Sequence, residues 1–307
     1  MKNKNLFLLL LLTTCWGPSF LLIKVALEEM PPLFLAGSRI ALGALTLNII
    51  RICRGVPFPT GGTFWRDVLI TGVFAQALPF SLINWGEQFV DSAMASLLNG
   101  LTPLSTIFLA HFMLSDEKMS NRKLLGVMMG IAGLLILVMP DLLSGMQATV
   151  WGIVAISIAA LSYGVGLVYA RKHFAGYDPI LAPSAQLMTV AMYLLPFGYF
   201  SSEVAILEIS LNTILSIAVL GVLGTGLAFL VYFKLLSTAG ASYVSSSTFI
   251  LPIYGIVLGT VFLHETITAW MLVGAATILV GVAFANGARL PKRDYRKFDL
   301  ASFSKIR

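Results

Sequence analysis

The chain has 307 residues, of which 58% are hydrophobic and only 11% charged, with a net charge of +6. A soluble domain carries about 25% charged residues, and one of this size could not bury so much apolar surface in a single core. The composition therefore excludes an ordinary soluble protein and predicts one that lies in a lipid bilayer.

The positive charge does not indicate a nucleic-acid partner. Seven of the twenty Lys and Arg residues lie in the tail after Asn286, and no basic stripe alternates with aromatic residues. The expected partner of these charges is a membrane surface. Cys15 and Cys53 are too few for a disulfide framework, and three histidines without paired spacing argue against a metal site. We therefore expect neither metal nor cofactor.

The first apolar stretch, residues 6–27, follows Lys2 and Lys4 in a pattern that also fits a secretory signal peptide. The stretch does not stop after a short apolar core, however. It continues through Trp16 and Phe20 to Leu27 without an A-x-A cleavage site. We expect it to remain in the protein as the first membrane helix.

Nine more stretches are long enough to span a bilayer, which takes about 20 apolar residues. They are residues 33–51, 67–86, 92–114, 122–139, 150–171, 179–200, 212–234, 241–263 and 267–286. Their continuous apolar character does not fit the alternating strands of a β-barrel. The connections are short, and the longest, residues 52–66, is rich in Gly and Pro. The sequence therefore predicts an all-α integral membrane protein with ten transmembrane helices.

The basic residues predict the orientation. With the N-terminus inside, eighteen of the twenty Lys and Arg residues fall in the inner segments, and the outer loops carry acidic residues instead. The two exceptions, Lys24 and Arg39, lie within spans. We expect a multi-pass protein of the inner or plasma membrane with both termini in the cytoplasm.

The two halves of the chain resemble each other at a shift of about 148 residues. The matches include Trp16-Gly17 with Tyr163-Gly164, Lys24 with Arg171, Pro32 with Pro179, Phe80 with Phe229, Ser96 with Ser245, and Pro103 with Pro252. We divide the chain into a first repeat, 1–145, a second repeat, 146–290, and a basic tail, 291–307. Because each repeat has five spans, an odd number, equivalent helices cross the membrane in opposite directions. Inverted repeats of this kind are typical of transporters.

Motifs at equivalent places in the two halves add a family resemblance. They are Trp16-Gly17-x-Ser19-Phe20, Pro32 followed by Arg39, and the segments 92–117, 124–137, 240–265 and 272–284. Together they resemble the EamA type of the drug/metabolite transporter superfamily over nearly the whole chain. The resemblance implies a ten-helix bundle that moves small metabolites, often outward and often amino acids or their relatives. His264 departs from the pattern, because small residues are more usual there.

Arg39 is the first candidate for substrate binding, because it lies about 10 Å into the membrane, seven residues past Pro32. A buried arginine is costly unless it is paired or hydrated. Its guanidinium offers a two-pronged donor for a substrate carboxylate, although a structural pair with Glu87 or with helix carbonyls is the alternative. Gln186 occupies the equivalent place in the second repeat.

Other polar or amphipathic residues within the spans are candidates for the same cavity, because such groups tend to avoid lipid. They are Trp16, Ser19, Gln76, Asn84, Trp85, Asn99, Tyr163 and Gln186. Trp85 fits an interfacial belt equally well. The run Ser245-Ser246-Ser247-Thr248 is as consistent with bonding to its own helix as with substrate contact. Lys24, near a helix end, is expected to reach the interface.

Three further features bear on movement and coupling. Prolines 18, 79, 103, 183, 196 and 252 fall within spans and permit kinks. Gly126-x-x-x-Gly130, with Gly274 and Gly281, predicts that the fifth and tenth helices pack closely, and leaves a homodimer open. Among acidic residues only Glu87 comes near the membrane, so the sequence favours facilitated exchange or export over obligate proton coupling.

Two competing classes are an enzyme and a scaffold. His111-Phe-Met-Leu-Ser-Asp116 fits the H-x4-D spacing of acyltransferases, in which histidine is the base. The spacing is short and no soluble catalytic domain accompanies it, so we expect no enzyme. A membrane scaffold without transport is the other alternative. The prediction is a secondary transporter of small metabolites, with Arg39 weakly favouring an anionic substrate.

Overall fold

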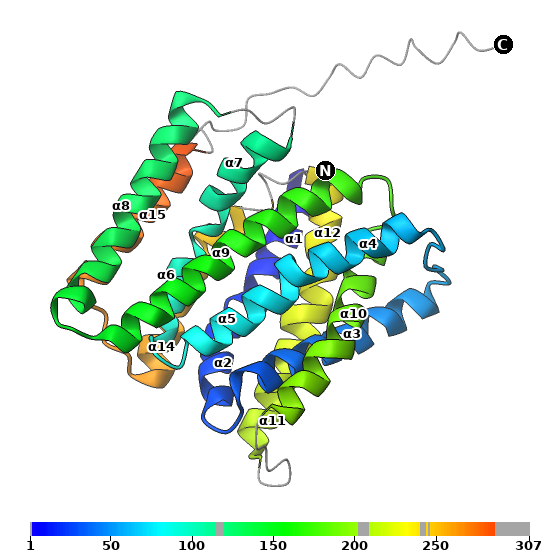
Figure 1. Ribbon diagram of the computed structural model, residues 1–307, viewed down its shortest axis with the longest axis horizontal. Helices are drawn as coiled ribbons and strands as arrows, with labels where there is room; N and C mark the ends of the chain where they lie inside the picture. Colours follow the sequence, from blue (N-terminus) through cyan, green and yellow to red (C-terminus); the bar gives the residue numbers. More distant parts are fainter. Residues whose placement is uncertain (1, 115–118, 202–208, 240–243, 245, 286–307) are drawn as a thin grey trace.

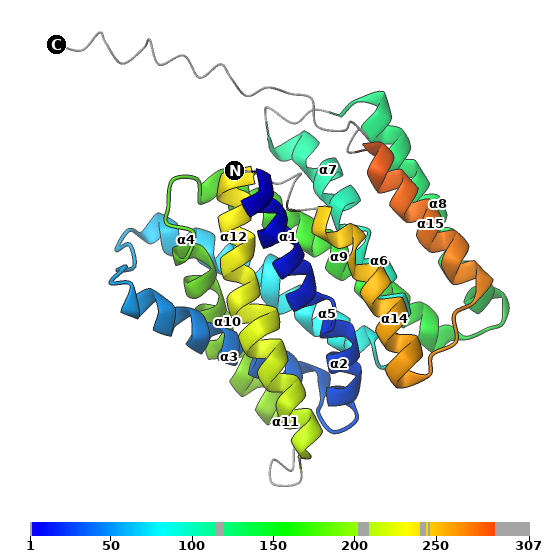
Figure 2. The ribbon, with the colours of Figure 1, turned by 180° about the vertical axis from the view of Figure 1, so that it is seen from behind.

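The computed structural model describes residues 2–114, 119–201, 209–239, 244 and 246–285, and every regular element in these ranges is helical. The predicted tail, residues 291–307, and Asp116 of the H-x4-D spacing lie outside the described residues. The helices form one bundle, in which elements distant in sequence lie side by side (Figures 1 and 2).

Seven helices in the described ranges are long and apolar enough to cross a membrane. They cover Lys4–Leu27, Pro32–Cys53, Gly62–Gly86, Ser92–Met113, Asn121–Pro140, Gln147–His173 and Leu211–Ala239. The 20-residue α10 (Leu181–Phe200) and the shorter apolar helices α14 (Leu251–Leu263) and α15 (Ala269–Ala285) correspond to the other three predicted spans. The third span begins at Gly62, earlier than predicted, so the loop at 52–66 is shorter than expected.

Three spans contain a break in the helix. The first consists of α1 (Lys2–Trp16) and α2 (Ser19–Leu27), the fourth of α6 (Ser92–Asn99) and α7 (Thr102–Met113), and the ninth includes η4 (Ser246–Phe249) before α14. The breaks coincide with Pro18, Pro103 and Pro252, because proline cannot donate to the preceding turn. Pro183 does not kink a helix, since it lies in the first turn of α10.

The third and eighth spans contain π-helical segments at equivalent places. In the third, η1 (Val73–Ala77) separates α4 (Gly62–Gly72) from α5 (Leu78–Gly86). In the eighth, η3 (Val219–Leu227) separates α11 (Leu211–Ala218) from α12 (Ala228–Ala239). A π segment widens the turn and disturbs the regular backbone bonding, and such segments are frequent at functional sites.

The fifth and tenth spans, α8 (Asn121–Leu143) and α15, pack closely, which confirms the prediction from their glycines. A Cβ added at Gly133 would lie 2.8 Å from the carbonyl oxygen of Gly274, and one at Gly281 would lie 2.7 Å from that of Gly126. Gly133 thus meets Gly274 and Gly126 meets Gly281, so the helices run antiparallel, side by side at one end of the bundle (Figure 1).

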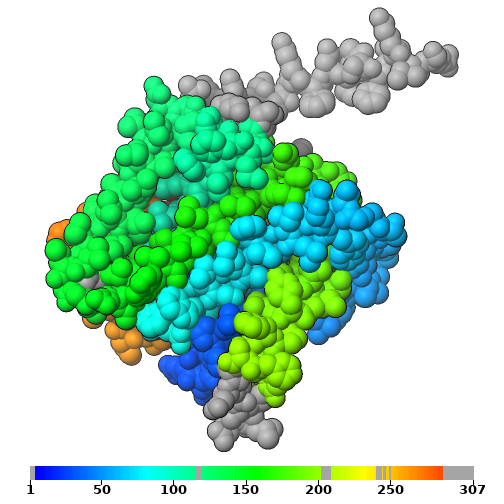
Figure 3. All heavy atoms as spheres, viewed as in Figure 1, coloured from blue at the N-terminus to red at the C-terminus, as the bar shows by residue number. Residues whose placement is uncertain are grey.

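The remaining helix contacts are symmetric: a contact made by a helix of one repeat is also made by the equivalent helix of the other. α3 (Pro32–Cys53) packs on its equivalent α10, and α6 on its equivalent α14. The first span packs on α11 and α12, as the sixth, α9 (Gln147–His173), packs on α4, η1 and α5. Figure 3 shows α9 against α4 and α5 across one face. The bundle is therefore built from two inverted five-helix repeats.

Candidate functional site

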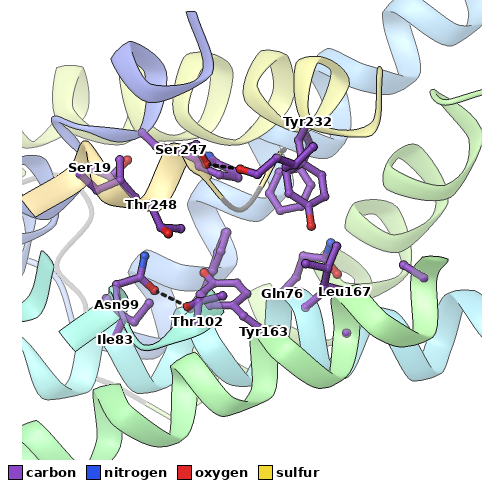
Figure 4. Close-up of a pocket in the computed structure, with 18 of the residues that line it drawn as sticks. Ser19, Gln76, Ile83, Asn99, Thr102, Tyr163, Leu167, Tyr232, Ser247 and Thr248 are labelled. Carbon is purple, nitrogen blue, oxygen red and sulfur yellow. Dashed lines mark hydrogen bonds between the residues drawn. The ribbon is translucent and has the colours of Figure 1, made fainter. Parts of the chain in front are cut away.

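A cavity lies between the two repeats. The empty space is about 1040 Å³, its mouth included. Figure 4 shows Asn99, Thr102, Tyr163 and Gln76 along one wall and Ser19, Thr248, Ser247 and Tyr232 along the opposite one. The walls are mainly apolar and aromatic with a few polar groups, which is the usual character of a small-molecule site.

Most of the lining residues occur in pairs that the repeat makes equivalent, at shifts of 147 to 149 residues. The pairs are Trp16 with Tyr163, Ser19 with Gly166, Phe20 with Leu167, Ile23 with Ala170, Arg39 with Gln186, Phe80 with Phe229, Ile83 with Tyr232, Asn99 with Thr248, and Thr102 with Leu251. A cavity whose opposite walls are equivalent lies on the pseudo-twofold axis that relates the repeats.

Arg39 is the one charged residue among the described residues that line the cavity, and it is 5% exposed. Its Nε donates a hydrogen bond of 3.2 Å to Thr225 Oγ1 in η3, and its guanidinium carbon lies 4.2 Å from the centre of the Phe80 ring. Its two terminal nitrogens have no hydrogen-bond partner within the described ranges. The paired N–H groups of the guanidinium are therefore available to a ligand.

Ser19 lies beside this guanidinium. A Cβ added at Gly224 would lie 3.2 Å from Ser19 Oγ and 3.8 Å from Arg39 Nη2, so both atoms approach the same backbone position of η3. Ser19 Oγ is buried without a hydrogen-bond partner among the described residues. Buried polar atoms normally have partners, so the unsatisfied Ser19 hydroxyl and the Arg39 nitrogens together form a polar site ready for an oxygen-rich group.

The equivalent place in the second repeat is neutral. The side-chain amides of Gln186 and Gln76 lie 3.0 Å apart, and Gln186 Nε2 lies 2.6 Å from Thr71 Oγ1. Gln76 belongs to η1, as Thr225 belongs to η3, so Gln76–Gln186 is the repeat counterpart of Arg39–Thr225. One wall thus carries a cation and the other a neutral pair of amides.

Carbonyl oxygens of both π-helical segments accept bonds from the other repeat. Trp16 Nε1 donates to the Gly224 carbonyl at 3.1 Å, and Ser162 Oγ donates to the Phe74 carbonyl at 2.7 Å. In each case the donor comes from the first span of one repeat and the acceptor from the third span of the other. These bonds fix both π segments against the helix that crosses them.

Aromatic rings cover the middle of the cavity. Phe80 and Phe229 face each other with ring centres 6.4 Å apart. Trp16 packs on Phe229 at 6.3 Å, as its counterpart Tyr163 packs on Phe80 at 6.4 Å. Tyr232 also lies 5.6 Å from Trp16. Such rings give a ligand apolar and π surface beside the Arg39 charge.

Seven of the nine predicted candidates line the cavity: Arg39, Trp16, Ser19, Gln76, Asn99, Tyr163 and Gln186. The other two, Asn84 and Trp85, are not among the residues that line it. Asn84 is buried and donates through Nδ2 to the Pro32 carbonyl at 3.1 Å, between the second and third spans. Trp85 is 40% exposed and packs on Phe89 at 4.9 Å on the outside of the bundle.

The sequence analysis did not name Phe80, Phe229 or Thr225 as site residues. Phe80 and Phe229 line the cavity, and Thr225 accepts the hydrogen bond from Arg39. The internal repeat contained a sequence signal for each of them. Phe80 and Phe229 match each other, and Thr225 is the repeat equivalent of Gln76.

Two contacts close the bundle on the side that holds residues 28–31, 87–91 and 264–268, here called the acidic side. Lys24 Nζ donates to the carbonyls of Glu87 and Val90 at 2.6 and 2.8 Å, so it is held by the end of the third span rather than directed to the interface. The Glu265 carboxylate accepts from the backbone N–H groups of Ser92 and Ala93 at 2.7 and 3.0 Å. That contact joins the second repeat to the first turn of α6, where the helix dipole favours a negative charge.

A different cluster lies at the opposite end of α4 and α9. Asp67 Oδ1 accepts from Tyr169 Oη at 2.9 Å, and Asp67 Oδ2 lies 3.2 Å from His173 Nδ1. The rings of Tyr169 and His173 are stacked 4.1 Å apart. The cluster joins the two repeats at this end as the Glu265 contact joins them at the other.

Neither a metal site nor the enzyme alternative gains support within the described ranges. No group of three or more His, Cys, Asp or Glu side chains there could hold a metal ion. His111 lies near the end of α7, where its Nδ1 accepts from the Met119 N–H at 3.0 Å, and it does not line the cavity.

Inverted repeats with a cavity between them are typical of polytopic membrane transporters. The chain belongs to the EamA-like transporter family, whose profile matches residues 3–139 and 150–287. This finding confirms the family resemblance seen in the sequence, and the protein is a transporter of the membrane.

Similar proteins support the assignment. "Uncharacterized transporter YoaV" of Bacillus subtilis (strain 168) is 29% identical over 92% of this chain and 96% of its own. A "Probable amino-acid metabolite efflux pump" of Salmonella typhimurium is 28% identical over 92% of this chain and 94% of its own. A crystal structure matches 93% of this chain and 98% of its own with a TM-score of 0.67 and 19% identity, which shows the fold alone.

Proposed function

We propose that this protein exports small metabolites that carry a carboxylate, such as amino acids or related compounds, by alternating access of the central cavity. The observation that carries the proposal is Arg39, a buried cation in the cavity wall whose two terminal nitrogens have no hydrogen-bond partner among the described residues. A guanidinium in this state is suited to a bidentate carboxylate. The aromatic rings beside it suit an apolar or aromatic side chain on the same substrate.

Alternating access is the expected mechanism because the cavity lies on the axis of two inverted repeats. Each repeat can adopt the conformation of the other, and the exchange opens the cavity to the other side. The contacts that must break and form are those between repeats, such as Glu265 with α6 on the acidic side. Relatives that are named efflux pumps support the proposed outward direction.

The proposed location is the inner or plasma membrane with both termini in the cytoplasm. The acidic side then faces outward, and the ends that carry Arg51, Arg54, Arg66, Arg171 and Lys172 face the cytoplasm, as the distribution of basic residues requires.

The test compares metabolites inside and outside cells that make the protein, cells that lack it, and cells that make Arg39→Gln. The glutamine copies the residue of the second repeat. We expect at least one carboxylate to accumulate in the medium only with the natural protein. The same metabolites in all three cultures, with equal amounts of both proteins in the membrane, would contradict the proposal.

A further inference from the structure

Glu87 lies on the cavity face of the third span. Two lining residues of α5, Phe80 and Ile83, are three residues apart, and Glu87 follows four residues after Ile83 at the end of the helix. At 3.6 residues per turn these three residues lie on one stripe of the helix. The carboxyl group therefore continues the cavity wall toward the acidic side, about one turn beyond the last lining residue.

The Glu87 side chain is completely buried, and both of its carboxylate oxygens lack a hydrogen-bond partner among the described residues. The two nearby cations do not bond to it. Lys24 donates to the Glu87 and Val90 backbone carbonyls, and Arg39 to Thr225. Burial without donors disfavours an ionised carboxylate far more than a neutral acid. The arrangement thus differs from a structural ion pair, which was the alternative for Arg39.

Four influences act on the charge of Glu87. Burial and the negative charge of Glu265 favour the neutral acid, whereas the positive charges of Lys24 and Arg39 favour the carboxylate. Among the described residues these three are the charged groups that act on it. Burial is the largest of the four influences, so the neutral acid is favoured.

We propose that Glu87 is a proton-binding site, and that a proton there and an anion at Arg39 favour each other's binding. The proton passes from water to a carboxylate oxygen, forms an O–H bond, and returns to water on release. A substrate carboxylate at Arg39 offsets the positive charge that stabilises ionised Glu87, so the equilibrium shifts toward the protonated form of Glu87. By linkage, protonation of Glu87 strengthens anion binding by the same factor.

Glu265 connects this site to the closure of the acidic side. Its carboxylate holds the first turn of α6 and repels an ionised Glu87. Protonation of Glu87 removes that repulsion and stabilises the closed contact. The contact on the acidic side is therefore stabilised while the proton and the anion are bound. This coupling rests on the transport function proposed above, whereas proton binding does not.

The experiment records pH-difference infrared spectra of the purified protein in lipid nanodiscs and follows the C=O stretching band of protonated carboxyl groups. We expect a band that titrates in the natural protein and is missing in Glu87→Gln. In Arg39→Gln the band should titrate at higher pH, because a stabilising cation is gone. In Glu265→Gln it should titrate at lower pH, because a repelling anion is gone.

A spectrum of Glu87→Gln identical to that of the natural protein would overturn the proposal. So would a Glu87 band that titrates at the same pH in Arg39→Gln and Glu265→Gln as in the natural protein. If Glu87→Gln does not fold, the opposite shifts of the other two variants still decide the question. The measurement needs no transport, so its failure is distinct from failure of the proposed function.

Discussion

Arg39 and Thr225 are joined by a hydrogen bond of 3.2 Å between Nε and Oγ1 that crosses from the second span of one repeat to the third span of the other. The side-chain amides of the equivalent residues, Gln186 and Gln76, also lie 3.0 Å apart. The two pairs are related by the pseudo-twofold axis, but only one carries charge. The contact between the repeats is therefore symmetric in position and asymmetric in charge.

Thr225 holds the guanidinium in place, so Thr225→Val tests its positioning. Valine keeps the shape and removes the acceptor, which leaves a buried donor unsatisfied at a cost of about 1–3 kcal/mol. We expect a KM for the transported carboxylate raised by about tenfold, since tenfold corresponds to about 1.4 kcal/mol. Thr277→Val is the control, because Thr277 does not line the cavity and its hydroxyl bonds to its own helix at the Val273 carbonyl. Equal KM values for the two variants would contradict this role.

The glycines between α8 and α15 allow the helices to approach closely. Gly281→Ala places a Cβ 2.7 Å from the Gly126 carbonyl oxygen and 2.9 Å from Met129 Cβ. Overpacking of this kind costs about 1–3 kcal/mol, so thermal unfolding in detergent should begin at a lower temperature. The control is Gly62→Ala, whose added Cβ would meet no atom within 4 Å. An unchanged unfolding temperature for Gly281→Ala would show that the helices separate freely.

Glu265 stabilises the closed acidic side through a charged acceptor at the start of α6. Replacing it with glutamine removes the charge, and charged hydrogen bonds are roughly twice as strong as neutral ones. We expect Glu265→Gln to lose about 1 kcal/mol, which corresponds to a fall in unfolding temperature of roughly 2 °C. Glu28→Gln, at an exposed position of the same side, should leave the temperature unchanged. A fall of the same size in both would mean that general surface charge, not the α6 contact, is responsible.

The two natural cysteines report the orientation. Cys53, the last residue of α3, is exposed, whereas Cys15 lies half-buried within the first span. With the termini in the cytoplasm, a membrane-impermeant maleimide should label Cys53 only after the cells are opened. Cys53→Ser provides the background. Labelling of intact cells would reverse the proposed orientation.

The fold could be read from the sequence to a large extent because lipid imposes simple rules. Apolar runs of spanning length predicted the helices, and the matches of Pro32 with Pro179 and Phe80 with Phe229 predicted the repeat. The glycines of the fifth and tenth spans predicted their contact. The π-helical segments could not be foreseen, because the choice between α and π turns depends on packing against the crossing helix, as at Gly224 and Phe74.

In the candidate site, the sequence did not predict which polar residues of a span face the cavity. Gln76 and Asn84 are both amide residues within one apolar span, but Gln76 belongs to the π-helical segment η1, whereas Asn84 belongs to α5 and donates to the Pro32 carbonyl. Only Gln76 lines the cavity. Polarity identified residues that avoid lipid, but it did not say whether each meets a cavity or another helix. Phe80 was missed because an aromatic ring facing a cavity has the same sequence signature as one facing lipid.

The most direct test of the central claim uses purified protein in liposomes loaded with a panel of amino acids and 2-oxo acids. Release of each solute is compared for the natural protein, Arg39→Lys and Arg39→Gln, with unfolding temperatures measured to confirm that all three are folded. We predict that at least one carboxylate leaves the liposomes fastest with the natural protein, more slowly with lysine, and at the protein-free rate with glutamine. Release by Arg39→Gln at the rate of the natural protein would contradict the claim that Arg39 binds the substrate in this cavity.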